Sequence, residues 1–508
     1  MIAPALALVA LLLHAATAMR YGYFRDELYF IACAKRLAWG YVDQPPFVAF
    51  AAWLAGPFGY PLFALRALPI LAAALTVYVA ARLAAELGGG RFAQALAGVA
   101  TLLAPAYLLL GNTLTTSSLE PLFWTLAIFV AIRIVRGPEE DAALWWLVLG
   151  VVMAAGCYAK YSMLLPVLGV VVGLLFTPQR RVLRSPFVLY AAAVAAVLLA
   201  PNLVWQASHG WPFVEVLRGD AAHRPAFAVG IALEYRNLWQ NLKAFAIEQL
   251  LYTNPMAAMV WVTGLVAPFR LRALRDLRFV SVGYAAVFLL AVAFAAKGYY
   301  IVGYYASLLA IGAIALERLR VPFRAAVFGL LVAVAVVAMP LSLPVLPVDT
   351  LVAYTQRLGL TGRAGAPPHL VQPVFAEEFG WDRLARDVAG VYFSLPPSVR
   401  RGTAIYADTY GDAGALDFFG PRYGLPPAIS SQNNYYLWGY RDYEGSTLVA
   451  IGATRVDLLR KYYRNVVLVR TSAEPYKWIV EGPAPIYLCS DPVLPLRRIW
   501  PNLRWYGA

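Results

Sequence analysis

Long apolar runs separated by short polar connections dominate the first two thirds of the chain. A helix needs about 20 mostly apolar residues to cross the hydrocarbon core of a bilayer, and these runs reach or approach that length. The pattern predicts a polytopic α-helical membrane protein with about eleven spans. We expect the spans at residues 2–19, 62–86, 93–111, 119–135, 143–158, 162–177, 187–205, 246–267, 279–296, 300–317 and 325–344.

The first run has an alternative interpretation as a secretory signal peptide. It lacks a basic leader, and the small residues at 15–18 only loosely match a cleavage site. Because many more apolar runs follow, we interpret it as the first membrane helix.

The pattern changes after Pro340, where several prolines end the last apolar run and the composition becomes mixed. Helices are expected at 381–393, 411–419 and 456–463, and strands at 403–407, 447–453, 465–471 and 486–489. Alternation of this kind predicts a small α/β domain. The expected division is a membrane domain at 1–344, with a first loop at 20–61, and a C-terminal domain at 345–508.

Arginines are concentrated in alternate connections between the predicted spans. They are Arg91, then Arg133 and Arg136, then Arg180, Arg181 and Arg184, then Arg270, Arg272, Arg275 and Arg278, and then Arg318, Arg320 and Arg324. Basic connections stay in the cytoplasm, so we expect a plasma or inner membrane protein with a cytoplasmic N-terminus. Loop 20–61 and the C-terminal domain then face outward, although the basic residues of that loop weakly oppose this orientation.

Composition narrows the classes of function. A chain that is 61% hydrophobic and 14% charged is not a water-soluble globule. Its net charge of +14 lies in clusters between predicted spans rather than on an aromatic-lined basic domain, so nucleic acid is not an expected partner. Three scattered cysteines and four scattered histidines indicate neither a disulfide framework nor a zinc site, and no metal ligands are assigned. A carboxylate-bound divalent cation stays open as a cofactor.

The most unusual stretch follows the first apolar run. Charged residues here alternate with seven aromatic residues between Tyr21 and Tyr41; they are Arg25, Asp26, Glu27, Lys35, Arg36 and Asp43. Charge close to hydrocarbon is costly and is retained mainly where it has a function. The stretch is therefore either an active site at the membrane surface or a solvated loop with aromatic residues at the headgroup level.

Four further polar features lie on the side of the membrane predicted to face outward. They are the run 112–120 ending in Glu120, the segment with Lys160 and Tyr161, the segment with Lys297, Tyr299 and Tyr300, and a loop with His209, Trp211, His223, Arg224, Glu234 and Arg236. Simpler explanations exist: Ser117 or Ser118 as a helix cap, and the lysines as side chains reaching the interface.

Together these residue types suit one reaction. Lysine and arginine attract phosphate, a carboxylate takes a proton from an attacking hydroxyl, and flat aromatic rings suit sugars and lipid tails. These requirements meet in the transfer of a sugar from a polyprenyl phosphate at the membrane surface.

Several motifs carry a resemblance to a known family. They are Phe24-Arg25-Asp26-Glu27-Leu28-Tyr29, Trp39-Gly40-Tyr41-Val42-Asp43-Gln44-Pro45-Pro46, Leu119-Glu120-Pro121-Leu122-Phe123-Trp124, Lys160-Tyr161-Ser162, Lys297-Gly298-Tyr299-Tyr300, the segment 410–416 and the segment 433–439. Through them most of the chain resembles bacterial membrane glycosyltransferases of glycosyltransferase family 39, the dolichyl-phosphate-mannose protein mannosyltransferase type. It is also similar to the related aminoarabinose transferases of lipid A, and both belong to the GT-C superfamily.

The resemblance implies a GT-C core of about eleven transmembrane helices and an extracytoplasmic C-terminal α/β domain. Asp26 matches the family's first-loop acid, which is expected to act as the catalytic base or to position the acceptor, and Glu27 follows it as a further catalytic candidate. Glu120 stands where relatives often carry an aspartate as second acid. Lys160 matches a lysine that contacts the lipid phosphate, and Tyr300 falls near a phosphate-contacting tyrosine.

The remaining residues of the matched motifs are expected to bind substrate; they are Arg25, Tyr29, Asp43, Gln44, Tyr161, Lys297 and Tyr299. The segment from Asp43 to Pro46 occupies the place of the family's Pro-Pro segment, which shapes the loop beside the site. The resemblance also implies inversion at the anomeric carbon.

We therefore predict a membrane glycosyltransferase, either a hexosyl- or a pentosyltransferase. Its donor is a polyprenyl-phosphate sugar, and its acceptor is a membrane lipid, an envelope glycan or a protein. The alternative from another class is a transporter or lipid flippase, which would carry repeats and polar groups at the bilayer midplane. A membrane scaffold that displays the C-terminal domain is a third interpretation, against which the paired acids argue.

Overall fold

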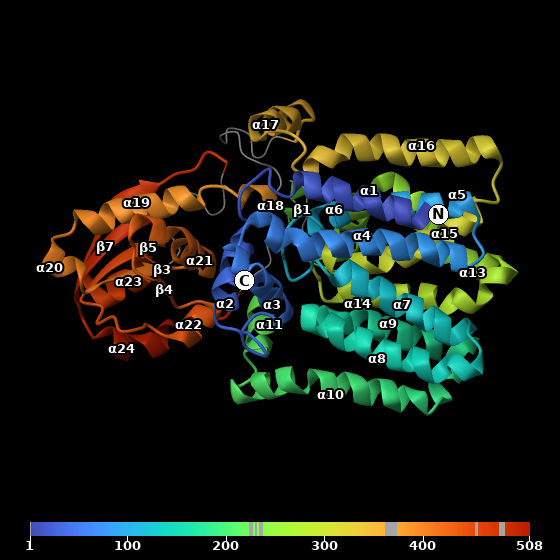
Figure 1. Ribbon diagram of the computed structural model, residues 1–508, viewed down its shortest axis with the longest axis horizontal. Coiled ribbons are helices and arrows are strands. Elements are labelled where there is room, and N and C mark those ends of the chain that lie inside the picture. The colour runs from blue at the N-terminus through green and yellow to red at the C-terminus, as the bar shows by residue number, and fades with distance from the viewer. Residues whose placement is uncertain are drawn as a thin grey trace. The chain divides into compact units, whose positions relative to one another are not determined.

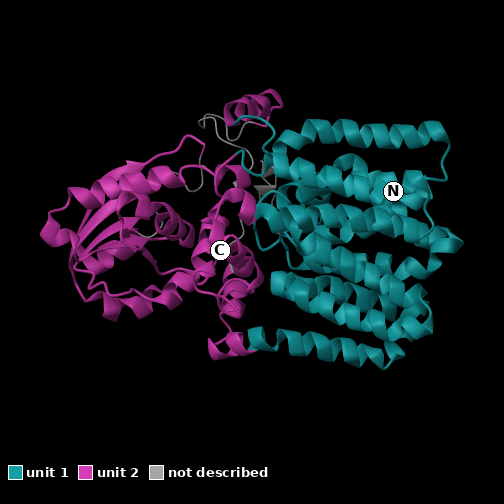
Figure 2. Cartoon of the chain, viewed as in Figure 1, with its two compact units in different colours: residues 1–20, 66–203, 226–347 teal, residues 21–65, 204–225, 348–508 magenta. Residues whose placement is uncertain are grey.

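The computed structural model describes residues 2–222, 227–228, 231–232, 237–360, 373–452, 456–476 and 483–507. The chain divides into two compact units, coloured separately in Figure 2. The first unit comprises Met1–Arg20, Arg66–Leu203 and Ala226–Pro347, and the second comprises Tyr21–Leu65, Val204–Pro225 and Val348–Ala508.

The first unit is a bundle of apolar helices, several of which run roughly parallel in Figure 1. In chain order they are α1 (Ile2–Thr17), α4 (Leu62–Glu86), α5 (Arg91–Leu102), α6 (Pro105–Leu110), α7 (Glu120–Arg136), α8 (Ala142–Ala159), α9 (Leu164–Leu175), α10 (Phe187–Ser208), α12 (Leu238–Thr253), α13 (Ala258–Arg270), α14 (Arg278–Ala293), α15 (Tyr305–Leu316) and α16 (Val321–Ala338). Two short strands, β1 (Phe227–Ala228) and β2 (Ile231–Ala232), form an antiparallel pair.

The mostly helical membrane fold predicted from the apolar runs is confirmed. Within the described residues, six helices are long and apolar enough to cross a membrane, or up to eight if each bent helix pair forms one span. The count of eleven spans stays a prediction.

Two predicted spans are interrupted where the backbone cannot continue a helix, and a third is followed by a sharp bend. The prediction of a single helix at 246–267 is wrong. The axes of α12 and of the segment that contains α13 differ by 101°. The bend lies at Asn254, whose φ of 73° is left-handed, and Pro255 follows it. The run at 93–111 divides into α5 and α6 before Pro105, which lacks a backbone N–H. The run at 162–177 is followed by a bend of 114° into the 3-10 segment Pro178–Arg184.

Glycines let two helix pairs of the first unit approach until backbones touch. A Cβ atom added at Gly312 of α15 would lie 1.9 Å from the carbonyl oxygen of Val260 in α13. Between α9 and α14, a Cβ atom at Gly173 would lie 2.0 Å from the carbonyl oxygen of Phe279. Without a hydrophobic driving force inside lipid, helices associate through such close packing at small residues.

The second unit contains a mixed five-stranded sheet with the order β4-β3-β5-β7-β6. Its strands are β3 (Thr403–Ala407), β4 (Ile429–Ser430), β5 (Thr447–Ile451), β6 (Tyr463–Ser472) and β7 (Ala484–Pro492). Strand β3 pairs in parallel with β4 and β5, whereas β7 pairs antiparallel with β5 and β6. All five residues of β3 are buried, as expected for a strand covered on both faces.

Helices pack on this sheet, among them α19, α21 and α23 (Figure 1). The helices of the second unit are α2 (Arg25–Ala34), α3 (Phe47–Leu54), α11 (Pro212–Ala222), α17 (Val348–Arg357), α18 (Pro373–Ala376), α19 (Trp381–Ser394), α20 (Pro397–Arg400), α21 (Tyr410–Phe419), α22 (Asn433–Trp438), α23 (Val456–Tyr462) and α24 (Leu496–Ile499). Each strand predicted in this region forms, with ends that shift by a few residues. The predicted outward loop at 20–61 contains α2 and α3, and its orientation stays a prediction.

Helix α2 packs against α21 of the same unit. A Cβ atom added at Gly414 would lie 2.9 Å from the backbone carbon of Leu28 and from the backbone nitrogen of Tyr29. The two helices therefore meet at backbone distance, which brings residues more than 380 positions apart in the sequence side by side, as with Asp26 and Tyr410.

We predict that Gly312→Ala lowers the stability of the bundle, because the added methyl group meets a backbone carbonyl that cannot turn away. Overpacking of this kind costs about 1–3 kcal/mol, measurable as a lower melting temperature in detergent. The matched control is Gly329→Ala in α16, where nothing lies within 4 Å of the added atom. If both variants melt together with the parent protein, α13 and α15 do not require the close approach.

Candidate active site

The start of α2 carries the predicted acids. The helix begins at Arg25, and the backbone N–H of Phe24 donates a 2.9 Å hydrogen bond to Oε2 of Glu27. Glu27 has 0% exposure and caps the helix N-terminus, where backbone N–H groups otherwise lack partners. This contact gives Glu27 a structural role, while its predicted catalytic role stays a prediction.

Asp26 lies beside an aromatic hydroxyl and a cation. The hydroxyl of Tyr410 donates a 2.9 Å hydrogen bond to Oδ1 of Asp26, and Nε of Arg25 lies 3.4 Å from the same oxygen. Arg25 also forms an ion pair with Glu377 at 3.3 Å. The Asp26 side chain keeps 25% exposure, so its carboxylate is anchored on one side and open on another.

Asp43 forms a second pair with a tyrosine in the same unit. The hydroxyl of Tyr29 donates a 2.9 Å hydrogen bond to Oδ1 of Asp43 and lies 3.2 Å from Oδ1 of Asn434. The rings of Tyr29 and Tyr410 pack with centroids 4.7 Å apart. The pairs Asp26–Tyr410 and Asp43–Tyr29 therefore form one continuous cluster.

The environment of Asp43 changes its titration. Burial raises the pKa of Asp43 to about 7, and the negative charge of Asp26 acts in the same direction. The hydrogen bond from Tyr29 opposes this shift, because it favours the ionised carboxylate. Asp43 therefore changes charge in the physiological pH range.

Gln44 differs from the other predicted residues of this stretch. Its side chain has 1% exposure, and its Nε2 lies 3.7 Å from Sγ of the buried Cys33. Gln44 therefore faces the interior of the second unit rather than an open site, and its predicted role in substrate binding has no supporting contact.

A second cluster of predicted residues forms inside the first unit. Nζ of Lys160 donates hydrogen bonds to Oγ of Ser117 at 2.6 Å and to Oε2 of Glu120 at 3.2 Å. The hydroxyl of Ser162 donates to the other carboxylate oxygen of Glu120. Glu120 has 5% side-chain exposure and Lys160 has 17%, so this is a largely buried ion pair.

Two tyrosines cover the amine of this pair. Nζ of Lys160 lies 5.1 Å from the ring centroid of Tyr299 and 4.6 Å from that of Tyr300. Both tyrosines belong to the 3-10 segment Gly298–Tyr304. Cation–π contacts at such distances stabilise an ammonium group. Lys160, Tyr299 and Tyr300 therefore lie together in the first unit, while their roles in substrate binding stay predictions.

Two other predicted residues take separate positions. Tyr161 donates a 2.8 Å hydrogen bond to Oδ1 of Asn202, and Lys297 is exposed just before the 3-10 segment. In the polar loop after α10, the ring of His209 stacks on Trp205 with centroids 4.1 Å apart. His223, Arg224, Glu234 and Arg236 lie outside the described residues.

The sequence interpretation missed several partners. Tyr410 and Asn434 belong to motifs that carry the resemblance, but nothing local links them to Asp26 or Asp43. Ser117 was interpreted as a helix cap, whereas its hydroxyl accepts a hydrogen bond from Lys160. Only the fold brings such residues together.

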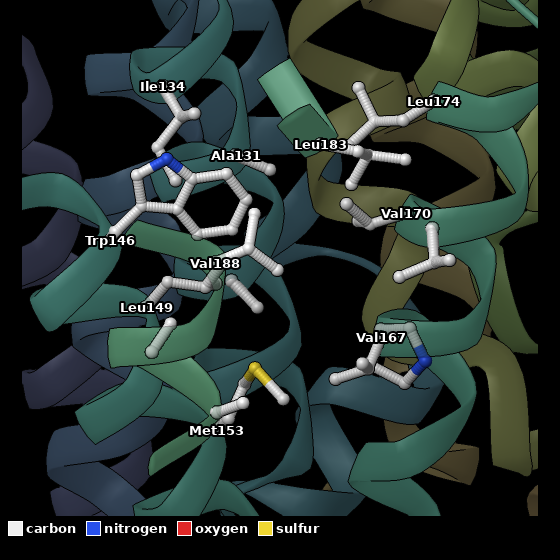
Figure 3. A pocket seen from close by; sticks show the side chains of 15 residues that line it. Ala131, Ile134, Trp146, Leu149, Met153, Val167, Val170, Leu174, Leu183 and Val188 are labelled. Atoms are coloured by element: carbon white, nitrogen blue, oxygen red, sulfur yellow. The ribbon is translucent and has the colours of Figure 1, made fainter. Parts of the chain in front are cut away.

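Two cavities in the described part of the first unit are lined by residues other than the predicted site residues. One of about 130 Å³ is lined by apolar side chains, among them Trp146 and Met153 (Figure 3). Another of about 560 Å³ lies among α12, α13 and α14 and includes Gln249 and Ser281. In the part of the chain that the structure describes, no group of three or more His, Cys, Asp or Glu side chains is arranged to hold a metal ion.

Comparisons with known proteins support the predicted resemblance. Residues 43–205 match the sequence model of a family described as dolichyl-phosphate-mannose-protein mannosyltransferase. A search of curated proteins finds no significant match.

Solved structures show the fold. ArnT from Cupriavidus metallidurans in the apo state is 15% identical with a TM-score of 0.60, and the match covers 95% of this chain and 97% of that chain. ArnT bound to undecaprenyl phosphate matches over the same shares with 15% identity and a TM-score of 0.59. An Archaeoglobus fulgidus oligosaccharyltransferase is 13% identical over 84% of this chain and 63% of its own, with a TM-score of 0.47.

The predicted resemblance to family 39 and to the lipid A aminoarabinose transferases is therefore confirmed at the level of fold and family model. The chain is a multi-pass membrane protein whose mostly helical fold, which includes a sheet near the C-terminus, is similar to that of ArnT.

We predict that Lys160→Met destabilises the first unit by about 3 kcal/mol, because it leaves the carboxylate of Glu120 buried without its cation. Glu120→Gln should recover part of this loss when added to Lys160→Met, since the unpaired charge is then removed. Thermal unfolding of the two single variants and the double variant measures the coupling. Strictly additive shifts would mean that the two side chains do not interact energetically.

Proposed function

We propose that the protein is an integral membrane glycosyltransferase that transfers a sugar from a polyprenyl-phosphate donor to an extracytoplasmic acceptor. The observation that carries this proposal is the partly exposed carboxylate of Asp26, held by Tyr410 and Arg25. A GT-C fold similar to that of ArnT is consistent with this activity. The proposed organisation has about eleven spans in a membrane domain at 1–344, a cytoplasmic N-terminus, and an outward-facing domain at 345–508.

Asp26 is the proposed base. The acceptor hydroxyl attacks the anomeric carbon of the sugar and gives its proton to the Asp26 carboxylate. The bond between that carbon and the phosphate oxygen breaks, and the electron pair leaves with the polyprenyl phosphate. Arg25 stabilises the ionised carboxylate before the transfer, and the hydrogen bond from Tyr410 fixes its orientation. Attack opposite the leaving group inverts the anomeric carbon, as the resemblance implies.

Lys160 is the proposed contact for the donor phosphate, with Tyr300 and Tyr299 beside it. Negative charge grows on the departing phosphate, and a preorganised cation stabilises it. The ArnT structure bound to undecaprenyl phosphate supports a polyprenyl phosphate as the ligand. In the structure the amine of Lys160 is paired with the carboxylate of Glu120. A donor phosphate therefore either displaces this carboxylate or binds Lys160 beside it. The hydroxyl of Ser117 accepts a hydrogen bond from Lys160, and that of Ser162 donates one to Glu120.

The other motif residues complete the proposal. Arg25, Tyr29 and Asp43 belong to the cluster around Asp26 and are assigned to substrate binding, whereas Gln44, Tyr161 and Lys297 keep this role on the resemblance alone. The acceptor is a lipid, an envelope glycan or a protein on the outer side of the membrane. A divalent cation that assists the phosphate is compatible with this scheme.

We predict that Asp26→Asn lowers turnover about 10²–10⁴-fold, because the amide keeps the shape of the side chain but cannot take a proton. Donor binding and thermal stability should change little. Glu27→Gln serves as the comparison: weakening its cap should lower the melting temperature more than it lowers turnover. Turnover is measured with a purified polyprenyl-phosphate sugar, and parental turnover in Asp26→Asn would remove Asp26 as the base.

We also predict the orientation of the chain from its arginine pattern. Reporter fusions after Arg181 and Arg275 should report the cytoplasm, and fusions after Gly219 and Gly380 should report the outer side. A cytoplasmic signal at Gly380 would place the C-terminal domain on the wrong side for a polyprenyl-linked donor used outside the cell.

A further inference from the structure

The second unit contains two carboxyl groups in unlike surroundings. Asp26 accepts a hydrogen bond from Tyr410 and lies 3.4 Å from Nε of the Arg25 guanidinium. Asp43 accepts a hydrogen bond from the neutral hydroxyl of Tyr29. The packed rings of Tyr29 and Tyr410 join the two pairs. Two neighbouring carboxyl groups in unlike surroundings are a common arrangement for acid–base chemistry.

The other charged and titratable groups near Asp43 belong to α2 with the residues just after it, and to α21. On α2 they are Asp26, Tyr29 and Cys33, which respond electrostatically to Asp43 or act on it. On α21 the group is Tyr410, which also senses Arg25 and Glu377. Arg36, at the end of α2, lies over the ring of Trp438 with 4.4 Å to its centroid. Arg25 thus forms ion pairs with Asp26 and Glu377, whereas Asp43 accepts a hydrogen bond from the neutral hydroxyl of Tyr29.

The backbone around Asp43 is held in place by the loop before α22. Oδ1 of Asn434 accepts a 2.7 Å hydrogen bond from the N–H of Val42, the residue before Asp43. The neighbouring Asn433 is buried with a left-handed φ of 47°. Such strained residues persist where the surroundings enforce them, often at functional sites.

Residues near the C-terminus hold Asn433 in this conformation. The N–H of Asn433 donates to the carbonyl of Trp505 at 3.0 Å, and the N–H of Gly507 donates to Oδ1 of Asn433 at 3.1 Å. The side chain of Gln432 accepts from the N–H of Tyr410 at 2.7 Å and donates to the carbonyl of Gly507 at 2.9 Å. One braced loop thus positions both tyrosines and the backbone beside Asp43, so the arrangement of the two acids is preorganised.

We propose that Asp43 is a second catalytic acid that works in its protonated form and donates a hydrogen bond to an oxygen of the acceptor, while ionised Asp26 takes the acceptor proton. This inference rests on the proposed function and adds a catalytic residue to it. Asp43 is partly exposed, as a group that touches substrate must be. Its raised pKa of about 7 keeps much of it protonated at neutral pH.

The protons balance in this scheme. The acceptor hydroxyl loses one proton to Asp26 as its oxygen bonds to the anomeric carbon, and Asp43 keeps its own proton throughout. Both acids are protonated after the transfer, and Asp26 then releases its proton to solvent. A carboxylate at Asp43 would have no hydrogen to donate and would lie close to the charge of Asp26.

The direction of the pH dependence follows. Raising the pH through the pKa of Asp43 removes its donor, so turnover should fall about tenfold between pH 6 and pH 8 for a pKa of about 7. Asp43→Asn carries an amide that donates at every pH and should remove most of this fall. Asp43→Ala has no donor and should lower turnover about tenfold already at pH 6, a loss typical of one hydrogen bond.

Asp491→Asn is the matched control. Asp491 is an acid of β7 in the same unit, paired with Arg464 at 3.5 Å and half exposed. This variant should keep both the parental turnover and the parental fall with pH. An Asp43→Asn enzyme that still loses activity at pH 8 like the parent protein, or an Asp43→Ala enzyme with parental turnover, would overturn the proposal.

An infrared titration gives a readout that does not depend on turnover. The difference between the spectra of the parent protein and of Asp43→Asn should contain the carbonyl stretch of a protonated carboxyl group, lost with a midpoint near pH 7. A midpoint below pH 5 would overturn the assignment of a protonated Asp43. If no polyprenyl-phosphate sugar is transferred but this band titrates near pH 7, the proposed glycosyl transfer is wrong. The protonated state of Asp43 is then still supported. Its proposed role as a catalytic acid is wrong together with the reaction.

Discussion

A charged or polar group removed from water costs several kcal/mol unless the protein gives it a partner, and this constraint shapes the polar parts of both units. In the first unit it accounts for the pairing of Lys160 with Glu120 among apolar helices, with Ser117 and Ser162 completing the hydrogen bonds. In the second unit it accounts for the contacts of Arg25 with Asp26 and Glu377. The chemistry proposed here depends on which partner each charge receives.

Asp26 and Asp43 show how different hydrogen-bond and charge partners give similar side chains different proposed roles. Asp26 has a guanidinium group and a tyrosine hydroxyl close to one oxygen, whereas Asp43 accepts a hydrogen bond from a tyrosine hydroxyl and has a raised pKa. An aspartate near a cation suits a base, and an aspartate whose pKa is raised suits a hydrogen-bond donor. The same residue type thus serves two roles because the packing of α2 on α21 places each in a different environment.

Backbone contact between helices is the means by which these environments are built. Gly414 lets α2 approach α21 closely enough for Tyr410 to reach Asp26. In the first unit, Gly312 allows the same close approach between α15 and α13, and Gly173 allows it between α9 and α14. A larger residue at such positions would move whole helices, so small residues that carry no reacting group determine where the functional side chains stand.

Much of the architecture was determined by the sequence alone. Apolar runs of membrane-spanning length predicted the helices, and alternating patterns predicted β3 and the other strands, because these features depend on local periodicity and on the bilayer thickness. The motifs around Asp26 and Lys160 identified candidate chemistry and the family resemblance. The tertiary structure alone decided the rest: the bend at Asn254, the capping role of Glu27, the burial of Gln44, and the partners Tyr410 and Asn434. The partners Tyr410 and Asn434 lie hundreds of positions from the residues they contact, and the other features depend on three-dimensional packing, which no local pattern encodes.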